Sequence, residues 1–567
     1  MDTTQFQKKK QMKKIKIFIV GLALGASAWL SYGFADNYFE LSKNLDIFST
    51  VFKELNTYYV DDTEPGQLMK TAIDEMLASL DPYTNYIPES KIEDFRFMTT
   101  GQYGGIGALI HKDSNKIIVS EPYEGFPAYN AGLKAGDVIK TIDNQSVEGK
   151  STSDISTILK GQPGTTLKVE VERPTANGTE TMIKEVNREN IKIDDVPYYG
   201  MLNDEVGYIK LVGFTQTASK EFIAAFKDLK DNKGMKKLVF DLRGNGGGLL
   251  IEAVDIVNVF VLKGSKIVET RGKLKEWDAV YAARNEALDT EIPLVVLVDE
   301  TSASASEIVS GALQDYDRAV IIGKQTFGKG LVQQTRPLSY NAQLKVTVAK
   351  YYIPSGRCIQ RIDYSNKDFK GKAQNVPDSL IQAYNTVKNK RKVLDGKGIK
   401  PDILTDKELL SPITRTLIRK YYIFNYATQF ALENPNIAKP ESFTLSDKQY
   451  NDFVAFLDDK DISYTTKSER LMEELKEIAI KEKYFDGAKS EYAALEEKIS
   501  KDKGEDLIKF KTEISEFLSN EIISRYYYQD GRIQQSLALD QDVMTAKENL
   551  SNLQDHKSIL AGTYSKL

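Results

Sequence analysis

The chain has 567 residues, 41% of them hydrophobic, which is enough for several buried cores and indicates three or four domains. Its net charge of -5 gives no basis for binding nucleic acid. With one cysteine and two histidines, the sequence excludes an intramolecular disulfide and a zinc cluster. It also contains no calcium loop, so no metal site is expected.

The first residues have the pattern of a targeting segment. Six lysines precede an apolar run over residues 17–30, and the small residues Gly33 and Ala35 follow it. This order is typical of an export signal, which we predict over residues 1–35. Extended to Phe34, the apolar run reaches 18 residues, so an uncleaved membrane anchor is the alternative. No cysteine lies near it, which excludes the usual bacterial lipoprotein attachment.

A helical region is predicted next, because Ile47, Val51 and Leu55 recur at the spacing of one helix face. A glycine turn then precedes an apolar strand within residues 103–110. Backbone amides in such a turn suit the capture of a terminal carboxylate followed by strand addition, and an ordinary tight hairpin is the alternative. The candidate amides are those of Gly104, Gly105, Ile106 and Gly107.

A glycine-rich loop over residues 241–248 lies between a strand at 238–240 and an apolar helix at 249–260. Successive amides without side chains form a nest that can hold an anion. A phosphate site is the rival interpretation, but the glycine spacing is not that of a dinucleotide loop, and no Gly-Lys-Ser or Gly-Lys-Thr loop occurs. We therefore predict that Gly246 or Gly247 contributes an amide to an oxyanion hole.

Ser304 follows a run of buried-strand residues at 292–298 and precedes a helical pattern. Glu307, three residues later, matches a capping box, so Ser304 is expected where the strand turns into the helix. The free amides and the macrodipole of a helix start favour an oxyanion, with the amide of Ala305 as the second donor.

Lys329 lies 25 residues after Ser304, between two glycines. A hydroxyl nucleophile needs a base, and with histidine almost absent, lysine is the natural substitute. Lys329 must then lose roughly 3 units from a free pKa of about 10.4, or about 4 kcal/mol. Gln333, four residues after Lys329, could orient the amine. The alternative is that Ser304 only caps a helix and that Lys329 is a solvated loop cation. Burial of the amine is expected among Ile308, Val320 and Ile322.

Together these segments resemble the carboxyl-terminal processing proteases, also called tail-specific proteases. The matching stretches are residues 241–248, 302–307, 328–330, 333 and 351–357. The resemblance covers roughly residues 36–403. It implies Ser304 as the nucleophile, Lys329 as the general base and Gln333 as the orienting residue. It also implies a multidomain α/β fold, with a crotonase- and Clp-protease-like core and an inserted PDZ domain that includes the glycine turn.

N-terminal helices and a helical C-terminal extension complete the expected architecture. The expected ranges are a signal peptide or anchor at 1–35, N-terminal helices at 36–95, the PDZ domain at 96–180, the serine protease core at 181–403 and the extension at 404–567. The resemblance implies that the N-terminal helices support a homodimer, and a helical lid on the core is the alternative. The extension is expected to pack on the core or on a second subunit.

We predict a serine endopeptidase that captures the C-terminal tails of protein substrates in its PDZ domain. It would cleave peptide bonds through an acyl-enzyme, with no cofactor. Two alternatives are a non-catalytic envelope scaffold that binds protein tails and a hydrolase of small esters or cell-wall amides. The export pattern places the chain on the periplasmic side of the cell envelope, either secreted across the inner membrane or anchored in it.

Overall fold

The computed structural model describes residues 38–175, 178–369, 371–406 and 410–564. The predicted signal segment at 1–35 lies outside the described residues. Within those ranges, no helix combines the length and the apolar character needed to cross a membrane. The chain divides into two compact units, one up to Tyr86 and one from Ile87 onward.

The first unit is helical, as predicted. Residues 38–58 and α2 (Pro65–Ala78) are helices, and many apolar side chains of the first helix are exposed, including Phe39 at 66%. The turn after α2 is held by the buried Asp81, whose carboxylate accepts from the backbone N–H groups of Tyr83 and Thr84 at 2.8 and 2.9 Å. Strand β1 (Asn85–Ile87) follows.

The first part of the second unit contains a six-stranded antiparallel sheet in the order β3-β4-β5-β7-β8, with β6 beside β5. Helix α5 has a Ser151 and Asp154 capping box, lies beside β3 and buries Ile155 and Leu159 in the core of this sheet. The elements are η1 (Glu89–Lys91), α3 (Ile92–Thr100), β2 (Gln102–Gly105), β3 (Ala108–Asp113), β4 (Lys116–Pro122), α4 (Pro127–Asn130), β5 (Val138–Ile142), β6 (Gln145–Ser146), α5 (Thr152–Leu159), β7 (Thr166–Thr175), β8 (Gly178–Asn187) and β9 (Glu189–Lys192).

Another six-stranded sheet, mostly parallel, follows in the order β10-β11-β12-β15-β16-β23. Only the edge pair of β10 and β11 is antiparallel. Its central strands are buried on both faces, as their uninterrupted apolar runs predict. The strands are β10 (Tyr198–Met201), β11 (Val206–Lys210), β12 (Lys237–Asp241), β15 (Leu294–Val298), β16 (Val320–Gly323) and β23 (Ile403–Leu404).

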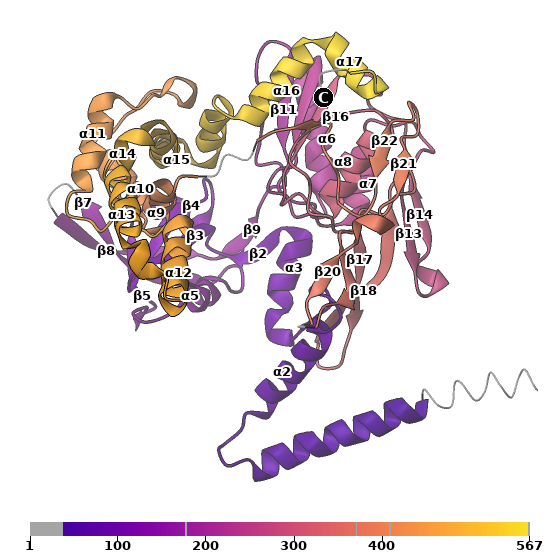
Figure 1. The fold of residues 1–567 in the computed structure, drawn as a ribbon, viewed down its shortest axis with the longest axis horizontal. Coiled ribbons are helices and arrows are strands. Elements are labelled where there is room, and N and C mark those ends of the chain that lie inside the picture. The colour runs from indigo at the N-terminus through magenta and orange to yellow at the C-terminus, as the bar shows by residue number, and fades with distance from the viewer. Residues whose placement is uncertain (1–37, 176–177, 370, 407–409, 565–567) are drawn as a thin grey trace, which may run out of the picture. The chain divides into compact units, whose positions relative to one another are not determined.

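Helices cover both faces of this sheet (Figure 1). On one face α6 (Ala218–Lys227), η2 (Asp228–Asn232), α7 (Leu250–Asn258) and α8 (Ala305–Asp315) share a core with Phe240. On the other face α16 (Gln541–Ser551) and α17 (Leu553–Ala561) pack against Val239. The end of the extension therefore forms one of the two helical layers on the parallel sheet, which confirms the prediction that the extension packs on the core.

A third sheet, which contains β13, β14, β17 and β18, lies beside α7 and α8. In it β18 pairs with β13 near its end and with β17 along most of its length. The elements of this region are β13 (Lys266–Gly272), η3 (Lys275–Trp277), β14 (Ala279–Ala282), β17 (Leu331–Pro337), β18 (Gln343–Tyr352), β19 (Ile362–Lys367), β20 (Ala373–Asn375), η4 (Asp378–Leu380), β21 (Ala383–Asn385) and β22 (Lys392–Leu394).

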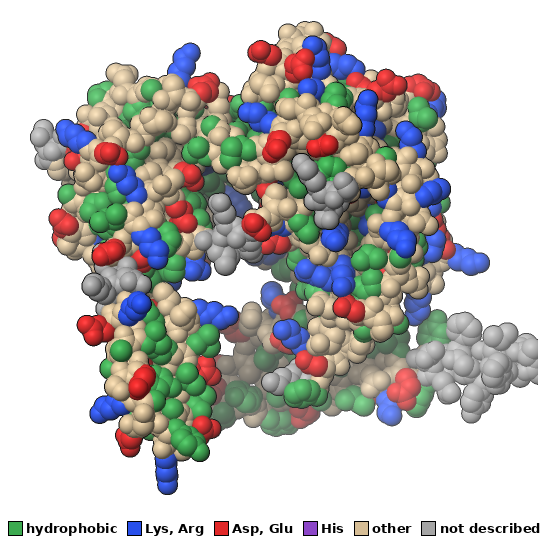
Figure 2. All heavy atoms as spheres, turned by 45° about the horizontal axis from the view of Figure 1, so that its top comes forward, with side chains coloured by type: hydrophobic (Ala, Val, Ile, Leu, Met, Phe, Trp, Pro, Cys, Tyr) green, Lys and Arg blue, Asp and Glu red, His purple; other side chains and the backbone are tan. Residues whose placement is uncertain are grey.

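The rest of the extension is a helical bundle with its own core, which includes Phe430, Phe453 and Ile522. On the face shown in Figure 2, basic and acidic side chains are interspersed over the surface. The helices are α9 (Pro412–Arg419), α10 (Tyr422–Glu433), η5 (Pro440–Ser442), α11 (Asp447–Phe456), α12 (Lys467–Lys481), η6 (Phe485–Gly487), α13 (Lys489–Gly504), α14 (Asp506–Lys509) and α15 (Lys511–Leu537).

Candidate active site

Ser304 lies at the sharp turn that leads from β15 into α8, where the sequence predicted it. It is the N-cap of α8 and has φ 55° and ψ -111°, a conformation that residues other than glycine rarely adopt. The turn is braced by the Asp299 carboxylate, which accepts from the N–H groups of Thr301 and Ser302 at 2.9 and 3.0 Å. A strained residue fixed in this way has a well-defined position.

The buried Glu307 carboxylate joins the serine turn to the lysine loop. Its Oε2 atom accepts from the backbone N–H of Ser304 and from that of Lys329, each at 2.9 Å. Its Oε1 atom accepts from Thr326 Oγ1 at 2.6 Å and from Gly328 N–H at 2.7 Å. Burial raises the pKa of Glu307, whereas the four donors favour its ionised form. The sequence predicted the bond to Ser304 but not those to the lysine loop.

Asn245 joins the glycine-rich loop to the same serine turn. Its carbonyl oxygen accepts from Ala303 N–H at 3.1 Å and from Ser306 Oγ at 2.9 Å. Its side-chain oxygen accepts from Gly247 N–H at 2.8 Å. The loop and the start of α8 are therefore held as one piece, although about 60 residues separate them.

The three predicted oxyanion amides lie at this junction. A Cβ atom on Gly247 would lie only 2.8 Å from Ser304 Cβ and 2.9 Å from the nitrogen of Ala305, so this close approach needs glycine. The Gly247 amide is already used by Asn245. The amides of Gly246 and Ala305 donate to no acceptor within the described chain, which makes these two the better suited donors.

A cavity of about 470 Å³ brings the predicted site residues together. Its lining includes Ser304, Ala305, Gly246, Gly247, Gly248, Ile308, Lys329 and Gln333. The Gln333 side chain donates from Nε2 to Thr347 Oγ1 at 3.2 Å, and the Tyr351 hydroxyl donates to the carbonyl oxygen of Ser304 at 3.1 Å. No role was predicted for Tyr351, because its contact with Ser304 joins positions 47 residues apart and leaves no local pattern.

The predicted apolar surroundings of Lys329 are only partly correct. Ile308 lines the same cavity. Val320 and Ile322 instead pack on the other face of the parallel sheet, with α16 and α17, while Ile321 between them faces α8. The prediction was wrong because a strand buried on both faces has no polar side to show which residues point where.

Of the predicted carboxylate-binding turn, only Ile106 and Gly107 lie between β2 and β3, whereas Gly104 and Gly105 end strand β2 and pair with β9. The chain of this turn is held closely, because a Cβ atom on Gly104 would lie 2.1 Å from Gly161 O and one on Gly107 would lie 2.6 Å from Phe126 Cβ. The carbonyl oxygen of Ile106, between Gly105 and Gly107, accepts from Ala128 N–H at 2.8 Å. Helix α5 lies beside β3, so the turn precedes a strand that packs against a helix.

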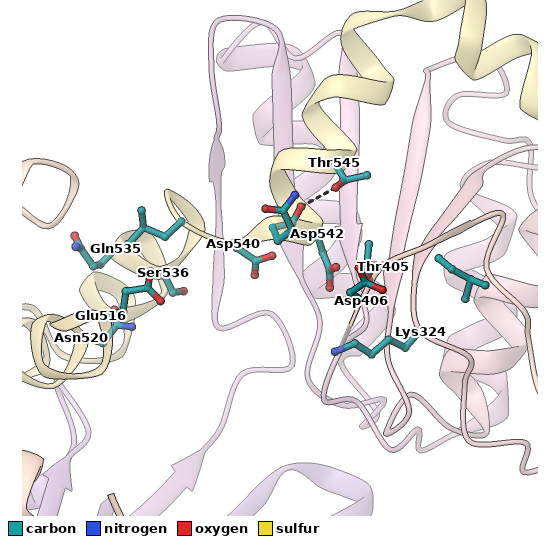
Figure 3. A pocket seen from close by; sticks show the side chains of 13 residues that line it. Lys324, Thr405, Asp406, Glu516, Asn520, Gln535, Ser536, Asp540, Asp542 and Thr545 are labelled. Carbon is teal, nitrogen blue, oxygen red and sulfur yellow. Dashed lines mark hydrogen bonds between the residues drawn. The ribbon is translucent and has the colours of Figure 1, made fainter. Parts of the chain in front are cut away.

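Arg243, in the glycine-rich loop, binds the C-terminal extension. Its guanidinium donates to both oxygens of Asp241, at 3.0 and 2.8 Å, and to Asp540 and Asp542, each at 2.9 Å. Asp540 and Asp542 stand at the start of α16 and border a polar pocket of about 590 Å³ (Figure 3). Burial acts to raise the pKa of Asp241, but Arg243 and Lys210 outweigh it and hold that pKa well below its usual range.

Removing Arg243 should destabilise the fold strongly. Arg243→Gln removes the cation that Asp241, Asp540 and Asp542 share and leaves Lys210 as an ion-pair partner of Asp241, so we expect the free energy of unfolding to fall by about 3–5 kcal/mol. The double change of Asp540 and Asp542 to Asn keeps the Asp241 pair and a good N-cap, so a smaller loss of about 1–2 kcal/mol is expected. Urea unfolding measures both. Equal losses would contradict this account.

Comparison with known proteins agrees with the fold. Residues 205–366 match peptidase family S41, residues 118–173 match a PDZ domain, and residues 413–550 match the C-terminal helical domain of a probable PDZ-protease. With the serine turn, the glycine-rich loop and the lysine around one cavity, these matches define a serine protease that carries a PDZ domain.

The chain is 36% identical over 356 residues to the carboxy-terminal-processing protease of Bartonella bacilliformis, covering 62% of this chain and 81% of that protein. It is 36% identical over 403 residues to a probable CtpA-like serine protease of Staphylococcus aureus, covering 69% and 75%. The solved photosystem II D1 C-terminal processing protease is 29% identical, with a TM-score of 0.35 over 64% of this chain and 93% of that one. The chain belongs to the carboxy-terminal-processing protease family of S41 peptidases.

Proposed function

We propose that Ser304 is the nucleophile of this serine endopeptidase, that Lys329 is its general base and that Gln333 orients the amine. The observation that carries the proposal is the Glu307 carboxylate, which binds the backbone of both Ser304 and Lys329 beside one cavity. A Ser-Lys pair from distant segments needs such a bridge, because hydroxyl and amine must meet within hydrogen-bond reach.

In the proposed reaction, neutral Lys329 takes the proton of Ser304 as Oγ attacks the carbonyl carbon of a peptide bond. The carbonyl oxygen becomes an oxyanion, which accepts from the amides of Gly246 and Ala305. Protonated Lys329 then donates its proton to the leaving amine, and the C–N bond breaks. Water then attacks the acyl-enzyme while Lys329 takes its proton. Lys329 returns this proton to Ser304 Oγ as the ester bond breaks, which releases the new carboxyl end and restores the enzyme. This scheme needs no cofactor.

The same proposal assigns tail capture to a PDZ domain over residues 96–180. Amides of the turn at 104–107 would bind the terminal carboxylate of the substrate, and the preceding residues would add as a strand between β3 and α5. The remaining divisions would be the protease core at 181–403 and the extension at 404–567. Support comes from the PDZ match, the turn geometry and the position of α5 beside β3.

The proposed location is the periplasmic side of the cell envelope, with residues 1–35 as a signal peptide or an inner-membrane anchor. The basic and apolar pattern of that segment supports export. A homodimer through the N-terminal helices is supported by the exposed apolar side chains along residues 38–58.

Full-length protein incubated with an unstructured polypeptide that ends in apolar residues should produce internal fragments, detected by mass spectrometry. Amidating the polypeptide's end should raise KM about 10-fold or more with little change in kcat, since only the terminal carboxylate is lost. Equal cleavage of both forms would reject tail capture. Absence of fragments from either form would instead favour the non-catalytic scaffold.

A further inference from the structure

Lys345 is a second lysine of the cavity, and no step of the proposed reaction uses it. It lies on β18, opposite Thr335 of β17 and two residues before Thr347. Because side chains alternate along a strand, Lys345 and Thr347 share one face of the sheet, and Thr347 accepts the hydrogen bond from Gln333. Lys345 lines the same cavity as Ser304.

The cavity has no acidic side chain to balance this lysine. Among the described residues that line it are two lysines, Lys345 and Lys329, and no Asp or Glu. Burial lowers the pKa of Lys345, and no charged neighbour opposes that effect. The ammonium group is thus partly removed from water with no ion pair inside the described chain.

Two other half-buried lysines of this protein show how a carboxylate partner offsets burial. Lys210 lies 3.3 Å from Asp241, and Lys237 lies 3.1 Å from Glu205. Partial burial of a charge is unfavourable unless a partner offsets it. Lys345 has no such partner within the described chain and lines the cavity that holds Ser304, so a substrate bound there can supply the carboxylate.

We propose that Lys345 forms a subsite for a carboxylate of the bound substrate. This inference rests on the proposed function and adds a substrate class to it. A strand advances about 3.3 Å per residue, so Lys345 stands roughly 7 Å along the sheet from Thr347. The carboxylate therefore belongs about two positions along an extended substrate from the residue opposite Gln333. It is either an acidic side chain or the chain terminus.

The test uses one parent polypeptide with a single Glu moved along the cleaved region, the matching Gln series, and amidated forms of both. Wild type should favour one Glu position over Gln by about 10-fold in kcat/KM. Lys345→Met should abolish that preference yet still cleave the Gln series, and K345E should favour Lys at the same position. Lys350→Met, at an exposed position of the same strand that does not line the cavity, is the control and should behave as wild type.

Amidation separates the two sources of the carboxylate. An effect of amidation that Lys345→Met removes assigns the chain terminus to Lys345, and an effect that persists in this variant belongs to another site. Equal rates on the Glu and Gln series in wild type, with no amidation effect that depends on Lys345, would overturn the subsite.

A binding measurement tests the subsite even if the protein cleaves none of the polypeptides. Calorimetry with Ser304→Ala measures the affinity for the Glu and Gln peptides directly. Tighter binding of the Glu peptide, lost on adding Lys345→Met, would support the subsite even if the proposed chemistry failed. Equal binding of both peptides would refute it.

Discussion

Ser304→Ala should lower kcat by about 10³-fold or more and leave KM nearly unchanged, because the covalent step is lost while the cavity keeps its shape. Lys329→Ala should cost about as much, and the double variant should be little worse than either one. Residues that act as one unit give such non-additive losses. The measurement is steady-state cleavage of a fluorogenic polypeptide, with mass spectrometry of the acyl-enzyme.

A neighbouring serine supplies the matched control. Ser310, on the same helix, donates from Oγ to the carbonyl oxygen of Ser306 and does not line the cavity. Ser310→Ala should therefore retain nearly all activity. Activity in Ser304→Ala close to that of the control would exclude this serine as the nucleophile, and multiplicative losses in the double variant would show that Ser304 and Lys329 act separately.

The sequence predicted those features of the site that depend only on residues close together in the chain. The turn at Ser304 follows from an apolar strand, a capping pair with Glu307 and a helical repeat, all within a short stretch. The glycine-rich loop was predictable for the same reason, since positions such as Gly247 tolerate no side chain. These features position the proposed nucleophile and the proposed oxyanion donors.

Contacts between distant segments could not be predicted. Glu307 reaches Lys329 across 22 residues, and Arg243 reaches Asp540 across 297, and neither pair has a spacing that marks it. The faces of β16 were misjudged at Val320 and Ile322 because both sides of that strand are buried. For a related reason, the sequence did not show whether α16 and α17 pack on the core or on a second subunit. The apolar face of an amphipathic helix indicates that it is covered, but not by which surface.

Glu307→Gln should reduce kcat about 100-fold although it preserves the size of the side chain. The carboxylate accepts on both oxygens, two donors on each, whereas an amide can accept on only one. An amide N–H would face either Ser304 and Lys329 or Thr326 and Gly328. In both orientations the serine turn shifts relative to the lysine loop, and small displacements of reacting groups are costly.

Stability must be separated from positioning, because unsatisfied buried donors cost about 1–3 kcal/mol each. Asp315 is the matched control: it is a buried carboxylate on the same helix, it pairs with Arg357 at 2.9 Å, and it does not line the cavity. Asp315→Asn should lower Tm by a similar amount yet keep kcat per folded molecule. An equal loss of kcat in both variants, at matched folded fractions, would mean that the loss follows destabilisation and not the position of Glu307. The bridge between Ser304 and Lys329 would then not set their reactive geometry.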